Sequence, residues 1–589
     1  MGPRSRRSAA GFLAFASVAG CSAGNPGAID RRGQHAAAWA PPPPARCNTP
    51  PGELLEYWRE APDAELLGTK TLGGAGQTQI RYYANDCREL SLVEVAAHLT
   101  SAANARRALQ VNSIGDEQVT VQIWLGSRRE YGTPLSLSAV DAERDRRALE
   151  LPPNLRATLT ALSGSFALVG TVSRQDALAL AALDQVRLFF VYPRYAASAA
   201  RDVTRALALG ESAVHSQGTI AVFDDCAEGA PALPAHASFA DAAGVTCLSS
   251  THGSRVSALA FAGLPEGARR LAAGLTLATT DAPESLAAPA LWAMQRQNTD
   301  VLVQTIHIGV FEGANDALDM LLVEAAYGRT ILVRASGNGD PTEPVVHRVA
   351  GALDVGAVND HDAPLMSMRM VHPYSVFGDR RGVHLLDNGI VTDLEGSSEG
   401  TSFSAPRTAA TALRMLPSLA SSPFRPLGIR ARLLGWARPE TCPVDTMEPP
   451  PLAEDSACGS GITDDLTGAG AALRGDADDR VAERLGAQAT TTLEVRAPAT
   501  GGPYRMRAAL AFEAEPGTGW IDALRPAADL DLRVINSAGE TVANAQSFDS
   551  DQEVTTWPAA AGETFRVVVE RLGGNSIRHA VLAWSAKKK

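Results

Sequence analysis

Between residues 218 and 475, short apolar runs alternate with helical stretches, and this alternation restricts the fold more than any other feature of the chain. The runs are GTIAVFDD, LAAGLTLAT, VLVQTIHIG, TILVRASGN and ALDVGAVN. Nearly continuous apolar runs are typical of strands that are buried on both faces. Alternation of such strands with helices predicts an α/β fold, in which helices cover both faces of a parallel sheet.

The segments on either side have other patterns, and 589 residues are too many for a single hydrophobic core. Residues 118–195 contain strand-like VTVQIWL, a helix over 153–162, strand-like FALVGTV, a helix that begins with a capping box at Ser173, and strand-like VRLFFVY, which predicts a small α+β sandwich. From residue 476 onward, short alternating runs separated by Gly, Asn, Asp and Pro predict an all-β sandwich.

The beginning of the chain predicts export. Arg4, Arg6 and Arg7 precede the apolar stretch AAGFLAFASVAG, which is too short to span a bilayer. Residues 18–21 (VAGC) have the pattern of a bacterial lipoprotein signal, in which Cys21 carries the lipid. The alternative is an ordinary signal peptide with an incidental Cys21. The lipid would be the only membrane contact, and it predicts an outer-membrane or cell-surface protein that processing can release.

The other six cysteines agree with an oxidising compartment. Their clustering suggests the pairs 47–87, 226–247 and 442–458, although six cysteines allow fifteen pairings and free thiols are the alternative. No metal-binding spacing is present among them. The formal net charge of −12, without a basic cluster, argues against nucleic-acid binding.

Four segments of the central region carry polar residues suited to catalysis. Asp224 ends the run IAVFDD, His252 opens the helix THGSRVSALAF, Asn338 ends ILVRASGN, and Ser402 lies at the start of the helix in GTSFSAPRTAATALRML. Hydrolysis by a serine requires a base for the hydroxyl proton, an acid that orients the base, and donors for the oxyanion. The carboxyl ends of parallel strands are where such groups meet.

The order Asp, His, Asn, Ser and the motif GTSFSAP resemble the subtilisin-like serine proteases (subtilases). The resemblance implies that Asp224 orients His252, that His252 is the general base, and that Ser402 is the nucleophile. It implies that Asn338 donates to the oxyanion together with the Ser402 backbone N–H. No cofactor is required; calcium occurs in the family, but no suitable carboxylate loop is visible, so a calcium site stays open.

Further roles follow from the same resemblance. Asp225 after Asp224 and Arg255 after the His motif are similar to the kexin-like branch, and Asp225 and Glu312 are candidates for contacting a basic substrate residue. His307, Ile308 and Gly309 fall where the family pairs its backbone with a polypeptide substrate. Residues 118–200 look like the family's prodomain, an intramolecular inhibitor whose tail near residues 192–195 enters the active-site cleft, with the mature chain beginning between about 195 and 215.

The resulting hypothesis is an exported serine endopeptidase; the alternatives are a catalytically inactive binding protein on the same fold and an esterase or amidase with the same triad. The predicted organisation is a signal peptide (1–21), a Pro/Gly/Ala-rich tether (22–46), a region of unknown role (47–117), the prodomain (118–200), the catalytic domain (201–475) and the C-terminal sandwich (476–589).

Overall fold

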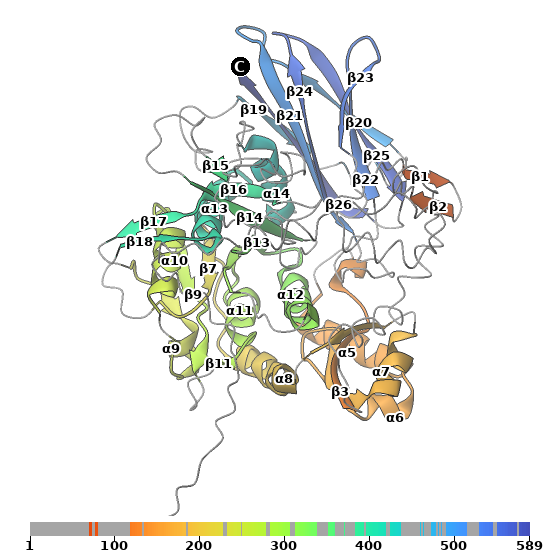
Figure 1. Ribbon diagram of the computed structural model, residues 1–589, viewed down its shortest axis with the longest axis vertical. Coiled ribbons are helices and arrows are strands. Elements are labelled where there is room, and N and C mark those ends of the chain that lie inside the picture. The colour runs from red at the N-terminus through yellow and green to blue at the C-terminus, as the bar shows by residue number, and fades with distance from the viewer. Residues whose placement is uncertain are drawn as a thin grey trace, which may run out of the picture.

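The computed structural model contains a central parallel sheet, a small α+β unit and a β-sandwich (Figure 1). The residues that the structure describes are 70–73, 77–80, 118–131, 135–183, 186–191, 193–227, 233–248, 250–277, 283–306, 312–338, 351–359, 370–371, 383–393, 396–419, 425–437, 460, 463, 473–478, 481, 485, 490–514, 529–545, 551–573 and 577–588. Cys21, the 47–87 and 442–458 pairs, and His307, Ile308 and Gly309 lie outside these residues.

The central sheet has the strand order β15-β14-β13-β12-β7-β9-β8, and β16 also pairs with β14. All of these pairs are parallel except that of β15. The strands are β7 (Thr219–Phe223), β8 (Ala237–Ser238), β9 (Arg269–Ala272), β12 (Val301–Gln304), β13 (Ile331–Ala335), β14 (Ala352–Asn359), β15 (Met370–Val371) and β16 (Leu385–Asn388). Because β9 and β8 follow on one side of β7 while β12 and β13 follow on the other, the sheet has a topological switch point between β7 and β12.

Helices cover both faces of this sheet, as the alternating pattern predicts. One face packs against α10 (Thr251–Phe261), α13 (Thr401–Met415) and α14 (Arg425–Trp436). The other packs against α8 (Pro193–Ala208), α11 (Ala288–Leu291), the π-helical turn η2 (Trp292–Arg296) and α12 (Glu312–Ala326). The predicted α/β class, with an α+β unit before it and a sandwich after it, is confirmed.

The α+β unit (residues 118–191) is an antiparallel sheet of order β4-β5-β3-β6 with three helices. Its elements are β3 (Gln118–Trp124), α5 (Leu137–Ala148), α6 (Pro153–Arg156), β4 (Leu159–Ala161), β5 (Ala167–Ser173), α7 (Arg174–Ala181) and β6 (Arg187–Phe190). Ser173 caps α7 by accepting from the Asp176 N–H at 3.0 Å, as predicted. The helix predicted over 153–162 is wrong beyond its first turn, because the β-branched Thr158 and Thr160 favour an extended chain and lead into β4.

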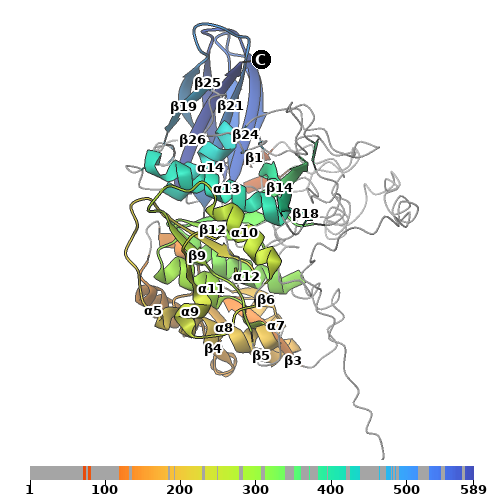
Figure 2. The same ribbon diagram turned by 90° about the vertical axis from the view of Figure 1, so that its left-hand side faces the viewer.

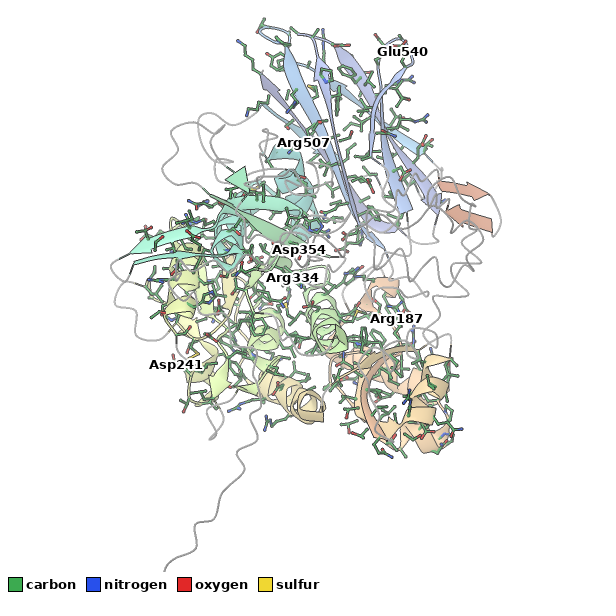
Figure 3. All side chains as sticks on the ribbon, in the orientation of Figure 1. Arg187, Asp241, Arg334, Asp354, Arg507 and Glu540 are labelled. Carbon is green, nitrogen blue, oxygen red and sulfur yellow. A yellow bond between two sulfur atoms is a disulfide. The ribbon has the colours of Figure 1, made fainter. Side chains whose placement is uncertain are left out.

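The sandwich (residues 473–588) consists of two antiparallel four-stranded sheets, β19-β26-β21-β24 and β20-β25-β22-β23. The strands are β19 (Leu473–Asp478), β20 (Thr490–Arg496), β21 (Tyr504–Ala514), β22 (Asp529–Ile535), β23 (Thr541–Ala545), β24 (Gln552–Ala559), β25 (Thr564–Gly573) and β26 (Ile577–Lys588). Arg507, labelled in Figure 3, lies where β21 meets α14 and donates to the Ala437 carbonyl at 2.8 Å. Figure 2 shows the sandwich at the α14 side of the central sheet.

The remaining elements are short: β1 (Lys70–Gly73), β2 (Gln77–Ile80), η1 (Arg128–Tyr131), α9 (Phe239–Ala243), β10 (Thr276–Leu277), β11 (Pro283–Ser285), β17 (Ile390–Asp393), β18 (Gly396–Glu399) and η4 (Leu416–Leu419). Within the described part of the chain, no helix combines the length and the apolar character that crossing a membrane requires.

Candidate active site

Asp224 lies at the carboxyl end of the buried strand β7, at the switch point of the central sheet. Its side chain is 1% exposed, and Oδ1 accepts from the backbone N–H of Asp225 at 2.6 Å. Oδ2 accepts from the hydroxyl of Thr305, which follows the neighbouring strand β12. The carboxylate is therefore fixed from two strands, and burial strengthens each of these hydrogen bonds.

His252 lies between this carboxylate and Ser402. Its Nδ1 is 3.1 Å from Asp224 Oδ1, and its Nε2 is 2.8 Å from Ser402 Oγ. A carboxylate oxygen accepts, so Nδ1 carries the proton and Nε2 is the acceptor for the serine hydroxyl. The ring is placed by the start of α10, where Ser250 caps the helix by accepting from the Gly253 N–H at 3.0 Å.

The charge of Asp224 changes the basicity of His252. Burial acts to lower the pKa of the imidazole, but the charge and the hydrogen bond of Asp224, together with the charge of Asp225, raise the pKa above its ordinary value. The imidazolium form is therefore stabilised beside Asp224, as a base that receives a proton from a serine requires.

Ser402 lies in the first turn of α13, where the backbone turns at Gly400. A Cβ on Gly400 would stand 3.0 Å from Ser402 Oγ and 3.3 Å from Asn338 Nδ2. The missing side chain of Gly400 thus leaves a space that both the serine hydroxyl and the Asn338 amide border.

Asn338 follows β13 and is oriented by Thr401. Its Oδ1 accepts from the Thr401 backbone N–H at 2.8 Å and from the Thr401 hydroxyl at 2.9 Å. Because both donors must face the amide oxygen, the assignment of Oδ1 and Nδ2 is fixed and Nδ2 is directed toward the space at Gly400. A donor in this position suits stabilisation of an oxyanion that forms on a carbonyl attacked by Ser402.

A disulfide joins the loop that carries Asp224 to the segment before His252. Cys226 and Cys247 are bonded, with their Cα atoms 5.7 Å apart, so this predicted pair is confirmed. The Cys226 N–H also donates to the Leu248 carbonyl at 2.6 Å. Gly253 packs closely here, since a Cβ on it would stand 2.3 Å from the Asp225 carbonyl oxygen. The two loops are therefore held together covalently and by close backbone packing.

Several residues of the site were not singled out from the sequence. Thr305 and Thr401 hold Asp224 and Asn338, and the ring of the buried Phe403 lies 5.4 Å from the His252 ring. Arg255, which the sequence analysis names only for its similarity to the kexin-like branch, donates to the Ser398 hydroxyl on β18 and so connects α10 with the strand before Ser402. Thr401 and Phe403 could have been identified as neighbours of Ser402 in GTSFSAP, whereas Thr305 has no local sequence signal.

Asp225 and Glu312 are the other predicted site residues that fall on described elements or loops. Asp225 is 6% exposed and lies beside Asp224, and burial followed by the charge of Asp224 raises the pKa of its carboxyl. Its contact with a substrate stays a prediction. Glu312 begins α12, but its side chain is outside the described part. In the described ranges, no group of three or more His, Cys, Asp or Glu side chains could hold a metal ion.

Comparisons by sequence find no matching protein-family model and no significantly similar curated protein. Comparisons by structure find proteases. The prenylagaramide maturation protease PagA is 18% identical over 42% of this chain and 91% of its own, with a TM-score of 0.30. The epidermin leader peptide processing serine protease of Staphylococcus aureus is 12% identical over 59% of this chain and 97% of its own, with a TM-score of 0.34. The fold of this chain is defined by its own sheet topology.

Proposed function

We propose that this chain is a serine endopeptidase of the subtilisin type, in which Ser402 attacks peptide carbonyls. The observation that carries the proposal is the hydrogen-bonded line from Ser402 Oγ through His252 to Asp224, with separations of 2.8 Å and 3.1 Å. The order of these residues along the chain is that of subtilisins and differs from that of chymotrypsin.

In the proposed mechanism, His252 Nε2 takes the hydroxyl proton as Ser402 Oγ forms a bond with the substrate carbonyl carbon. Asp224 stabilises the resulting imidazolium, while Asn338 Nδ2 donates to the oxyanion. The imidazolium then gives its proton to the leaving amine, and the peptide bond breaks to leave an acyl-enzyme. Water, deprotonated by His252, hydrolyses the acyl-enzyme and restores Ser402.

Hydrolysis of a quenched fluorescent protein substrate tests the proposal and separates it from its alternatives. Chain lacking residues 1–24 is expected to cleave the protein substrate, and the Ser402→Ala variant is expected to lose this activity. Cleavage of small esters without cleavage of peptides would favour an esterase. Folded protein that hydrolyses neither would favour a binding protein.

We also propose that the chain is exported and anchored through a lipid on Cys21. The Cys226–Cys247 disulfide supports this localisation, because disulfides persist in oxidising compartments. Metabolic labelling with a radioactive fatty acid is expected to label the full chain and not the Cys21→Ala variant. Equal labelling of both chains would contradict a lipid on Cys21.

A further inference from the structure

Glu324 of helix α12 is a buried carboxylate whose oxygens accept hydrogen bonds from the α+β unit. Glu324 is 3% exposed; Oε1 accepts from the Ser127 hydroxyl at 2.6 Å and Oε2 from the Arg128 backbone N–H at 2.8 Å. A second contact follows one face of the helix, since Gln122 Nε2 donates to the Ala317 carbonyl at 3.0 Å. A buried carboxylate is tolerated when it is fully hydrogen-bonded, so residues 127 and 128 belong to the environment in which α12 is stable.

The apolar packing continues across the same boundary. Trp124, Phe166 and Phe189 of the α+β unit form one buried cluster with residues of α12, among them Leu318 and Leu321. A core shared between two units is typical of obligate interfaces, whereas units that separate have more polar contacts. Release of the α+β unit would expose this apolar surface to water.

The chain that leaves the α+β unit differs from the predicted tail. An extended segment near residues 192–195 would enter the cleft, but α8 begins at Pro193. The buried Asp202 of α8 accepts from the backbone N–H groups of Leu286 at 2.8 Å and Ala287 at 3.2 Å. Helix α8 therefore lies with α11 on the sheet face opposite α13, the helix of Ser402, as Figures 1 and 2 also show.

The sandwich contacts the same junction. Asp551 Oδ2 accepts from Arg430 Nη2 of α14 at 2.6 Å and from the Gly351 N–H at 2.7 Å. Arg129 lies against Gly351, since a Cβ there would stand 2.5 Å from Arg129 Nη2. Burial raises the pKa of Glu513 in the sandwich, and the charges of Arg129 and Arg430 act against this rise. Residues 127–129 thus join a buried cluster of charges to which all three units contribute.

We propose that the α+β unit and α8 together form a permanently docked subunit, held on α12 by residues 127 and 128 and beside Gly351 by Arg129, which stays bound when the chain after α8 is cleaved. This inference rests on the proposed function and deepens it, because the predicted prodomain would then be a retained fragment of a stable two-fragment protease. A protease could reach the segment that follows α8, because Val214 in this segment is 66% exposed.

A controlled cut tests this docking without any need for activity. A recognition sequence for a site-specific protease is inserted after Ala213 in the Ser402→Ala chain, and the folded protein is cut. On size-exclusion chromatography, the fragment ending at residue 213 is expected to co-elute with the remainder in native buffer and to separate in denaturant. Separate elution in native buffer would overturn the proposal.

Substitutions at Glu324 test whether the junction holds the fragment. Glu324→Lys places a positive charge beside Arg128 and is expected to weaken retention on the order of tenfold or more. Glu324→Gln keeps the shape of the side chain and is expected to weaken retention of the fragment less. This variant provides the test if the Lys variant does not fold. The control Glu266→Lys changes an exposed glutamate and should retain the fragment like the parent.

Retention by both Glu324 variants equal to that of the parent would contradict a docking role for residues 127 and 128. The same cut made in the chain with Ser402 intact keeps the two proposals separate. If that chain hydrolyses no substrate, the proposed function fails, while co-elution of the fragments still decides the docking.

Discussion

Gly400 determines the space in front of the candidate nucleophile. Its φ of 168° is extended and open to any residue, so alanine there introduces no backbone strain. The added Cβ would stand 3.0 Å from Ser402 Oγ and 3.3 Å from Asn338 Nδ2, where the oxyanion of the substrate is expected. The methyl group therefore interferes with the chemistry and leaves the fold unchanged.

We predict that Gly400→Ala lowers kcat/KM by about 10²-fold, a loss similar to that of an oxyanion donor, with little change in Tm. The matched control is Gly210→Ala, because a Cβ at Gly210 meets no atom within 4 Å. Equal activity of the two variants would contradict the position assigned to the oxyanion.

The hydroxyl of Thr305 influences catalysis indirectly, by donating a hydrogen bond to Asp224. We predict that Thr305→Val lowers kcat by about tenfold, because a buried hydrogen bond to a charged group contributes about 1.5–3 kcal/mol. Thr330→Val is the control, since it removes another buried hydroxyl, which donates to the Thr299 carbonyl at 2.7 Å away from the triad. Steady-state kinetics corrected for active enzyme should show the loss in kcat for Thr305→Val alone.

The pH dependence of activity follows from the raised pKa of His252. The imidazole acts as a base only when neutral, so kcat/KM is expected to be low in acid and to rise with pH through an apparent pKa above about 6.5. In Asp224→Asn the pKa is expected to fall, because the charge that raises it is gone. An apparent pKa of the parent below 6.5, measured with a neutral peptide substrate, would contradict the arrangement.

The contribution of His252 to the free energy of unfolding decreases as pH rises, whereas kcat/KM increases. Asp224 stabilises the protonated ring, so this contribution is present below the pKa of the unfolded chain and is lost as pH rises through the higher folded pKa.

At the scale of elements, the disulfide is the link between β7 and α10. It closes a loop with a sequence separation of 21 residues, and such a loop predicts a stabilisation of about 3 kcal/mol. We predict that the double variant Cys226→Ser, Cys247→Ser loses about this much free energy of unfolding and most of its activity, because Asp224 and His252 lie on the joined loops. Denaturant unfolding measures the first effect; a double variant with the activity of the parent would show that the disulfide does not position the pair.

The elements also show what the sequence could and could not predict. β7, β12, β13 and β14 were visible because strands buried on both faces have continuous apolar runs. The start of α8 was not, because a Pro at a helix start and a Pro in an extended tail look alike locally. The side of the sheet on which α8 packs is decided by Asp202 and distant backbone N–H groups, for which no local pattern exists.

At the scale of the whole molecule, the order of the strands explains why a site forms. Asp224 and Thr305 follow β7 and β12, the two strands at the switch point, and Asn338 follows the next strand, β13. The sequence could predict Asp224 and Asn338 at strand ends and His252 and Ser402 at helix starts, because a motif accompanies each of them. The contacts that fix them were not, since Thr305 and Arg255 act on residues that are distant in sequence.

The pairing of buried charged groups could not be predicted from the sequence either. Arg334 of β13, labelled in Figure 3 with Asp354 of β14, is 0% exposed and pairs with Asp319 of α12 at 3.0 Å. Arginine is almost never fully buried without a partner, and the local sequence does not show which residue pairs with Arg334. A second acidic partner, Asp354 of the neighbouring strand, lies 3.9 Å from Arg334 Nε, so both partners come from elements distant in sequence.

The measurement that tests the central claim most directly is covalent labelling with a fluorophosphonate probe, followed by mass spectrometry of the digested protein. The proposed geometry predicts one adduct, on the peptide that contains Ser402, formed faster above the pKa of His252 and absent in His252→Ala. No adduct on folded protein, or an adduct on another serine that persists in Ser402→Ala, would contradict the assignment of Ser402 as the nucleophile.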